Sequence, residues 1–262
     1  MKRAICFGIN AYSQSPIGAG GGAMSLQGCI KDSETMEAIF DANGFETSWR
    51  FTDHDVNYEN LRDLIAQFAT ESKEDDQLGI SFSGHGTYRD AYENGKYVRH
   101  TGIVLWDRIL WDSDFKMMLA AIPAKRGVQI YVDACFSQDN YKMYNGLAVN
   151  TKVYQEKYVA LKYLKSEVAV YTSKVVAATK IKCNVISINS STLQEPSFDM
   201  GPEGGLFTLS IPKAMRRKPK GNYMDTKKAI QRVMTESGLP QHCVISTVNG
   251  NDWAWTYRSF LS

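Results

Sequence analysis

The sequence predicts an α/β fold with a mainly parallel central sheet of six or more strands and helices on both faces. Short apolar runs that suit buried strands alternate with segments whose apolar residues recur at helical spacing. This alternation is typical of strand–helix–strand units, whose strands pair in parallel. The chain has 262 residues, 44% hydrophobic and 22% charged, which is enough apolar material for one large core.

The first half of the chain is expected to contain three strands and two helices. The apolar runs that suit strands occupy residues 3–8, 45–51 and 78–82. A first helix is expected from Leu26 to Asn43-Gly44, a pair that favours a helix stop. A second amphipathic helix passes through 61–68, and Asn57 is suited to cap it.

The second half repeats the pattern with a longer interruption. A helix through 115–122, capped by Asp112 or Ser113, precedes a fourth strand. The later strands and helices are expected at 128–132, 184–189, 205–215, 225–237 and 243–248. Pro212 is expected to kink or shorten the helix at 205–215, and Asp225 is expected to cap the last helix.

Two short segments that follow expected strands carry the chemistry. Ser83-Gly84-His85-Gly86 follows the third strand, and Asp133-Ala134-Cys135 follows the fourth. Because ligands and catalytic groups collect beyond the carboxyl ends of parallel strands, we expect His85 and Cys135 at one edge of the sheet. A histidine and a cysteine are the two groups that a thiol hydrolase needs.

Composition excludes several other classes of protein. The formal charge of +2 is too small to indicate nucleic acid or an acidic membrane as a partner. The five cysteines are odd in number and lack a C-x-x-C pair, which disfavours disulfides and zinc. No apolar run approaches the length of a membrane span. A cytoplasmic protein is therefore expected.

Four segments in order resemble the caspase-like cysteine peptidases (clan CD, peptidase C14), within them the metacaspase and orthocaspase branch. The resemblance covers most of the chain and rests on residues 26–32, 83–86, 133–135 and 204–208. It implies the caspase-hemoglobinase fold. It also implies that Cys135 is the nucleophile, that His85 exchanges a proton with it, and that the N–H groups of Gly86 and Cys135 form the oxyanion hole.

The same resemblance implies a specificity pocket. Metacaspases carry acidic residues at the positions of Asp32 and Asp133, with a serine and a cysteine nearby that correspond to Ser83 and Cys29. Two carboxylates in a partly desolvated slot attract a cationic side chain, so the expected substrate is a peptide or protein with Arg or Lys before the scissile bond. For Asp32 taken alone, a solvated first-turn acid favoured by the helix dipole is the preferred interpretation.

We expect a single caspase-like domain over residues 1–262, with about 136–182 as an inserted or intersubunit segment. The lysines of this segment suit a solvated surface loop, or a site that the enzyme cuts in itself. We expect no recruitment module before the first strand, and we therefore expect a regulator to be a separate chain or this segment.

No cofactor and no resident metal is expected. Calcium activation is left open, but no clear calcium site supports it. The nearby aspartates do not match the aspartate cluster of calcium-dependent relatives: Asp107, Asp112, Asp114 and Asp139. Two other functions also stay open. One is a non-catalytic interaction module with the caspase fold, an interpretation that the unusual Phe136 and the helix-kinking Pro212 allow. The other is a protease of the same fold with a different preference.

Overall fold

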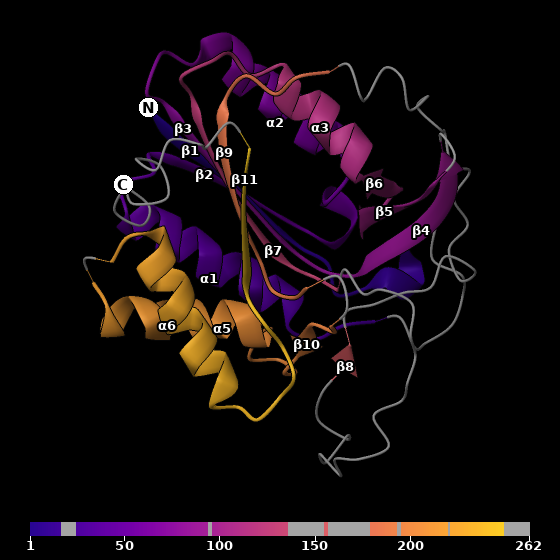
Figure 1. Ribbon diagram of the computed structural model, residues 1–262, viewed down its shortest axis with the longest axis vertical. Helices are drawn as coiled ribbons and strands as arrows, with labels where there is room; N and C mark the ends of the chain where they lie inside the picture. Colours follow the sequence, from indigo (N-terminus) through magenta and orange to yellow (C-terminus); the bar gives the residue numbers. More distant parts are fainter. Residues whose placement is uncertain are drawn as a thin grey trace.

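The structure is a computed structural model that describes residues 1–16, 25–93, 96–135, 155–156, 179–192, 195–219 and 221–248. Its centre is a six-stranded sheet (Figure 1). The strands are β1 (Lys2–Gly8), β2 (Thr47–Thr52), β3 (Gln77–Ser83), β7 (Gly127–Asp133), β9 (Asn184–Asn189) and β11 (Val244–Val248). In space they run in the order β11-β9-β7-β3-β1-β2.

The sheet is mainly parallel, as predicted. Four neighbouring pairs are parallel, and β11 alone pairs with its neighbour β9 in the antiparallel direction. The parallel register aligns the ends of β3 and β7, with Ser83 opposite Asp133. The segments that follow these two strands therefore leave the same edge of the sheet side by side.

Helices cover both faces of the sheet (Figure 1). The helices α1 (Cys29–Ala42), α5 (Leu206–Arg217) and α6 (Tyr223–Thr235) lie on one face, and α2 (Tyr58–Glu71) and α3 (Asp112–Ala120) lie on the other. Each face has its own hydrophobic cluster. Successive side chains of β1 alternate between them, because neighbouring residues of a strand point to opposite faces: Ile5 and Phe7 join one cluster, Ala4 and Cys6 the other.

One predicted helix cap is confirmed and two are wrong. Asn57 caps α2, accepting the N–H of Asn60. The residue before α3 is Trp111, which makes no side-chain cap, because β6 leads directly into this helix. The cap of α6 is Asn222, whose Oδ1 accepts the N–H of Asp225. Asp225 therefore lies within the first turn, where its charge suits the helix dipole.

The helix α5 continues through Pro212 and is not shortened by it. The proline removes one backbone donor, which normally breaks a helix. Here Ile211 and Ala214, on either side of Pro212, are fully buried in the cluster between α5 and the sheet. Burial of this face outweighs the lost hydrogen bond, since tertiary packing supplies most of the stability of helices in proteins.

The sequence analysis missed a second sheet, in which β4 (Gly86–Glu93), β5 (Lys96–Val104) and β6 (Ile109–Trp111) are antiparallel. It also missed two-stranded pairing of β8 (Gln155–Glu156) with β10 (Phe198–Asp199), and the 3-10 turns at Tyr12–Gln14 and Asp53–Asp55. Apart from β8 and residues 179–182, the segment 136–182 falls outside the described residues, so the prediction of a single domain with an insertion stays a prediction. In the described part, no helix is both long and apolar enough to span a bilayer.

Candidate active site

Two neighbouring strand ends bring His85 and Cys135 to the same edge of the sheet. The N–H of Gly84 donates to the carbonyl of Asp133 at 3.3 Å, which extends the pairing of β3 and β7 beyond their last residues. One residue further, Gly86 lies so close to Cys135 that a Cβ on it would be 1.7 Å from the Cys135 carbonyl oxygen. The segment that carries His85 therefore contacts the segment that carries Cys135 on both sides of His85, at Gly84 and at Gly86.

The position of His85 is held by the side chain of Tyr12. The Tyr12 hydroxyl accepts the N–H of His85 at 2.9 Å and donates to the carbonyl of Val104 at 2.7 Å. The two rings are 4.6 Å apart, at 48°. The His85 carbonyl in turn accepts the N–H of Val104. Since Tyr12 and His85 are both buried, the first residues after β3 are fixed on several sides.

The sulfur of Cys135 is fully buried and lies against the backbone of Ser197. The N–H of Ser197 donates to Sγ at 2.9 Å, and Sγ lies 3.5 Å from the Ser197 carbonyl oxygen, to which it donates. The hydroxyls of Ser190 and Ser191 both donate to the carbonyl of Ala134. Residues that follow β9 therefore hold the segment after β7 in place.

Asp32 and Asp133 point inward, and each is 1% exposed. Asp32, in the first turn of α1, accepts hydrogen bonds from Ser83 Oγ at 2.5 Å and from the N–H of Gly205 at 2.7 Å. Its burial excludes the solvated first-turn acid that remained open as an interpretation. Gly204, at φ +124°, lies so close that a Cβ on it would be 2.5 Å from Asp32 Oδ1.

Asp133 is bound by the start of α5 and by Ser197. Its Oδ2 accepts the N–H and the hydroxyl of Thr208, at 3.1 and 2.8 Å, and its Oδ1 accepts the Ser197 hydroxyl at 2.7 Å. Every carboxylate oxygen of Asp32 and Asp133 thus accepts at least one hydrogen bond from the chain. Such bonds offset part of the cost of burying an acid.

The cavity between the two acids is small. Asp32, Ser83, Asp133 and Thr208 line it together with aromatic, aliphatic and two further serine side chains, and its volume is about 10 Å³. A cavity of this size holds about one water molecule. Three of the four predicted pocket residues therefore meet, but in a closed arrangement that leaves no room for a Lys or Arg side chain.

The fourth predicted pocket residue, Cys29, is the first residue of α1 and is fully buried. Its N–H donates to Asn10 Oδ1 at 2.9 Å. Its carbonyl oxygen lies against the end of β1, where a Cβ on Gly8 would be 2.2 Å away. Among the described residues, Cys29 is not part of the lining of the small cavity.

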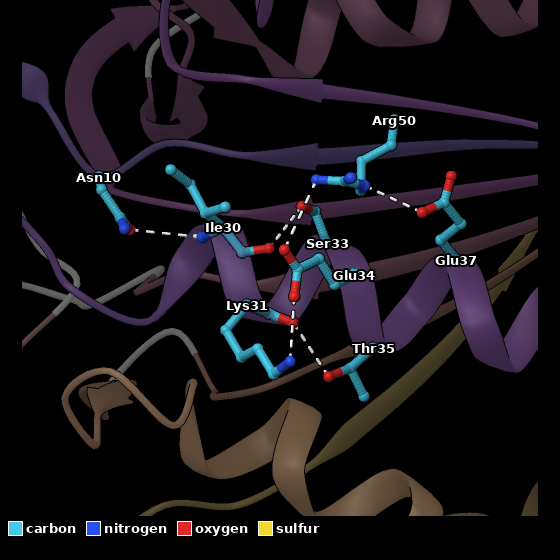
Figure 2. A network of polar contacts seen from close by, with 8 residues as sticks. All are labelled: Asn10, Ile30, Lys31, Ser33, Glu34, Thr35, Glu37 and Arg50. Carbon is cyan, nitrogen blue, oxygen red and sulfur yellow. Dashed lines mark hydrogen bonds and ion pairs between the residues drawn. The ribbon is translucent and has the colours of Figure 1, made fainter.

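The start of α1 is held by other parts of the chain. Figure 2 shows the amide of Asn10 at the N–H of Ile30, which it accepts at 3.4 Å in addition to that of Cys29. Buried Asp199 accepts the N–H groups of Gln27 and Gly28. These bonds satisfy donors that the helix itself leaves without partners, and they fix the turn that carries Asp32.

Sequence reasoning missed several residues of this site. Thr208 was part of a recognised motif but received no role there, and Ser197, Tyr12, Asn10 and Asp199 received none at all. No periodic pattern or spacing marks them, because each acts across 19 to 172 positions of the chain. Only the glycines beside them hinted at close approach of the backbone.

The other cysteines lie in the core. Burial raises the pKa of the Cys6 and Cys243 thiols to about 12 and that of Cys183 to about 11. These three therefore stay neutral thiols at ordinary pH and behave as small apolar side chains. None of the five cysteines, all of which are described, forms a disulfide.

Two of the aspartates considered for calcium, Asp107 and Asp112, are engaged locally, whereas the buried Oδ1 of Asp114 has no hydrogen-bond partner in the described contacts. Asp107 accepts the N–H of Tyr58 and pairs with Arg108. Asp112 accepts the N–H of Ser113 and lies 3.5 Å from His100. Asp139 is outside the described residues. Within the part of the chain that is described, no three acidic, His or Cys side chains are grouped in a way that suits a metal ion.

Comparison with known proteins agrees with the fold and with the family that the sequence resembles. The family model described as Caspase domain, of the peptidase C14 class, matches residues 1–251. The chain therefore belongs to the caspase-domain family. Metacaspase-7 of Arabidopsis thaliana is 31% identical over 175 residues, a match that covers 61% of this chain. The match spans about two fifths (41%) of the plant protein's length.

Two solved structures have the same fold. A structural-genomics protein of Geobacter sulfurreducens is 22% identical and superimposes with a TM-score of 0.77, covering 98% of this chain and 97% of its own. Caspase-1 of Spodoptera frugiperda is 14% identical, with a TM-score of 0.57 and coverage of 94% and 85%. The predicted caspase-hemoglobinase fold is thereby confirmed.

Proposed function

We propose that this protein is a cysteine endopeptidase that cleaves after Arg or Lys. The observation that carries the proposal is the contact of Gly86 with Cys135, which joins the segment of His85 to the segment of Cys135 at one sheet edge. A thiol hydrolase needs its nucleophile and its base in such proximity. Membership of the caspase-domain family supports the same chemistry.

In the proposed reaction, His85 takes the thiol proton of Cys135, and the thiolate attacks the carbonyl carbon of the scissile bond. The carbonyl electrons move to oxygen, where the N–H groups of Gly86 and Cys135 stabilise the charge. The C–N bond then breaks, and His85 donates its proton to the leaving amine. Water next attacks the acyl-enzyme, gives a proton to His85 and releases the acid, and the thiol is restored.

The preference for a basic residue rests on Asp32 and Asp133. Two buried carboxylates separated by a cavity give a site where a cation is favoured and an acid is repelled. Bonds from Ser83, Thr208 and Ser197 orient the two acids. The five cysteines form no disulfide, which agrees with a peptidase that acts in the reducing cytoplasm.

The first prediction concerns turnover on fluorogenic peptides that end in Arg, Lys or Asp, assayed with and without calcium. The native protein is expected to cleave after Arg and Lys only. Cys135→Ala is expected to abolish turnover, because no acyl-enzyme can form. His85→Ala is expected to lower kcat by about 10²- to 10⁴-fold, the usual contribution of general acid–base catalysis.

Two outcomes would contradict this proposed function and favour another one. Turnover after Asp alone would show a protease of the same fold with another preference. No turnover on any peptide, together with a Cys135 that resists alkylation, would favour an interaction module, which the complete burial of Cys135 and the small cavity also fit. The buried variant Ser210→Ala, away from the cavity, is a suitable control for folding.

A further inference from the structure

Ser197 is in contact with both halves of the proposed site at once. Its main chain lies on the sulfur of Cys135, with the N–H 2.9 Å from Sγ. Its hydroxyl donates to Oδ1 of Asp133 at 2.7 Å. Ser197 itself is completely buried. A single residue therefore covers the proposed nucleophile and occupies one oxygen of the proposed specificity acid.

Gln241 also holds Ser197 and its neighbours. Gln241 Nε2 donates to the Ser197 hydroxyl at 3.2 Å and to the carbonyl of Ser190 at 2.9 Å, while Gln241 Oε1 accepts the N–H of Phe198. The other polar residues that touch the two acids from the cavity side lie on regular elements: Ser83 ends β3, and Thr208 lies in α5. Ser197 lies in the connection between β9 and β10.

Ser197 does not line the closed cavity, but its hydroxyl occupies Oδ1 of Asp133, one of the two acids that do. A Lys or Arg side chain does not fit in about 10 Å³. Moving Ser83 or Thr208 would break a strand end or the first turn of a helix. Moving Ser197 breaks its bonds to Asp133, Cys135 and Gln241, but Ser197 itself lies outside β9 and α5, directly before the two-residue strand β10.

We propose that Ser197 couples the specificity pocket to the nucleophile. A cationic side chain that takes Oδ1 of Asp133 from the Ser197 hydroxyl also draws the Ser197 main chain away from the sulfur of Cys135. The nucleophile is then uncovered only when the pocket is filled. This inference rests on the proposed function, because it takes Asp133 as the acid that receives the basic residue.

The exchange at Asp133 favours a cation over any neutral group. A hydrogen bond between a charged donor and a carboxylate is about twice as strong as one from a neutral hydroxyl. A neutral or acidic side chain offers no such gain and leaves Ser197 in place. Specificity would then arise by induced fit, in which binding of the correct side chain completes the site.

The test measures how fast iodoacetamide, a neutral reagent, alkylates Cys135, resolved by peptide mass spectrometry. The native protein is compared in buffer, with n-butylguanidinium as a mimic of the Arg side chain, and with neutral n-butylurea. Alkylation is expected to rise about tenfold with the cation, as for release of one hydrogen bond to a charged group. No change is expected with the urea.

Variants assign the effect to the hydroxyl of Ser197. Ser197→Ala is expected to be alkylated rapidly without any cation and to show no further response. Ser197→Thr keeps a hydroxyl and is expected to respond as the native protein does. The control is Ser210→Ala, which removes a buried hydroxyl that donates only to Leu206 of its own helix in the described contacts.

Three results would overturn the coupling: equal alkylation of Ser197→Ala and native protein in buffer, a cation response that persists in Ser197→Ala, or no cation response in the native protein. The last result needs no variant, so it decides the matter even if Ser197→Ala fails to fold. Cleavage of Arg peptides without a cation response would refute the coupling but not the proposed peptidase function. A cation response without cleavage would support the coupling and refute the proposed peptidase function.

Discussion

At the scale of single residues, the site depends on a position where no side chain fits. Gly86 faces the backbone of Cys135, and backbone cannot move aside as a flexible side chain can. Glycine allows this close approach. The N–H groups proposed for the oxyanion hole belong to these same two residues, so their spacing depends on the missing Cβ.

Gly86→Ala is therefore expected to reduce turnover strongly and to lower the free energy of unfolding by about 1 to 3 kcal/mol, the usual cost of overpacking. Chemical unfolding and peptide cleavage measure the two effects. The matched control is Gly44→Ala after α1, where φ is +78° and nothing lies within 4 Å of the added Cβ. That change is expected to cost about 1 kcal/mol through backbone strain and to leave turnover unchanged. Full activity in Gly86→Ala would contradict this account.

At the scale of elements, helix α1 carries Asp32 but does not cap itself. Its own N-cap residue, Gly28, makes no side-chain bond. Asn10 from the end of β1 and Asp199 from β10 accept the N–H groups at its start instead. The orientation of the proposed specificity acid is thus set by residues of two distant strands.

Replacing the two asparagine caps separates stability from specificity. Asn10→Ala and Asn222→Ala are each expected to lower the free energy of unfolding by about 1 kcal/mol, because each loses a cap. Only Asn10→Ala is expected to raise KM for Arg peptides, since α1 carries Asp32 and α6 carries no residue of the site. Steady-state kinetics on both variants checks this, and equal KM values would refute the role of α1.

At the scale of the whole molecule, one sheet separates two buried clusters, and the thiols and phenol within them resist ionisation. Burial raises the pKa of Cys6 and Cys243 from 9.0 to about 12, and burial likewise raises the pKa of Tyr131 well above 10.0. Between pH 9 and 12 the unfolded chain loses these protons while the folded chain keeps them. The free energy of unfolding must therefore fall as the pH rises through this window.

We expect the double variant Cys6→Ala/Cys243→Ala to show a shallower loss of stability between pH 9 and 10.5 than the native protein. The variant is also expected to be less stable at pH 8, because two buried side chains become smaller. Chemical unfolding under reducing conditions at each pH measures both. Parallel pH curves for the two proteins would mean that these thiols do not carry the effect.

Much of the fold follows from local patterns. The strands β1, β3, β7 and β9 were predicted within a residue or two, because each is a largely buried apolar run. The sheet of β4, β5 and β6 was missed, since its strands carry polar residues and no clear alternation marks them. The expectation that Pro212 shortens α5 was wrong, because the local cost of the proline is outweighed by the burial of the helix.

The site divides in the same way. The edge of the sheet that holds His85 and Cys135 was predicted from motifs that follow strands, and the pocket acids Asp32 and Asp133 were implied by the family resemblance. The closed arrangement of the acids was not predicted, because it depends on hydrogen bonds from Ser197, Thr208 and Gly205, which reach the acids across long stretches of chain.

By itself, then, the sequence determined the alternation of strands and helices, and with it the edge where a thiol and an imidazole meet, because hydrophobic periodicity and parallel pairing are local rules. Only the tertiary structure decided that the sulfur lies under the backbone of Ser197 and that the acids enclose about 10 Å³. Those features depend on hydrogen bonds between segments that are far apart in the chain, and no local pattern records them.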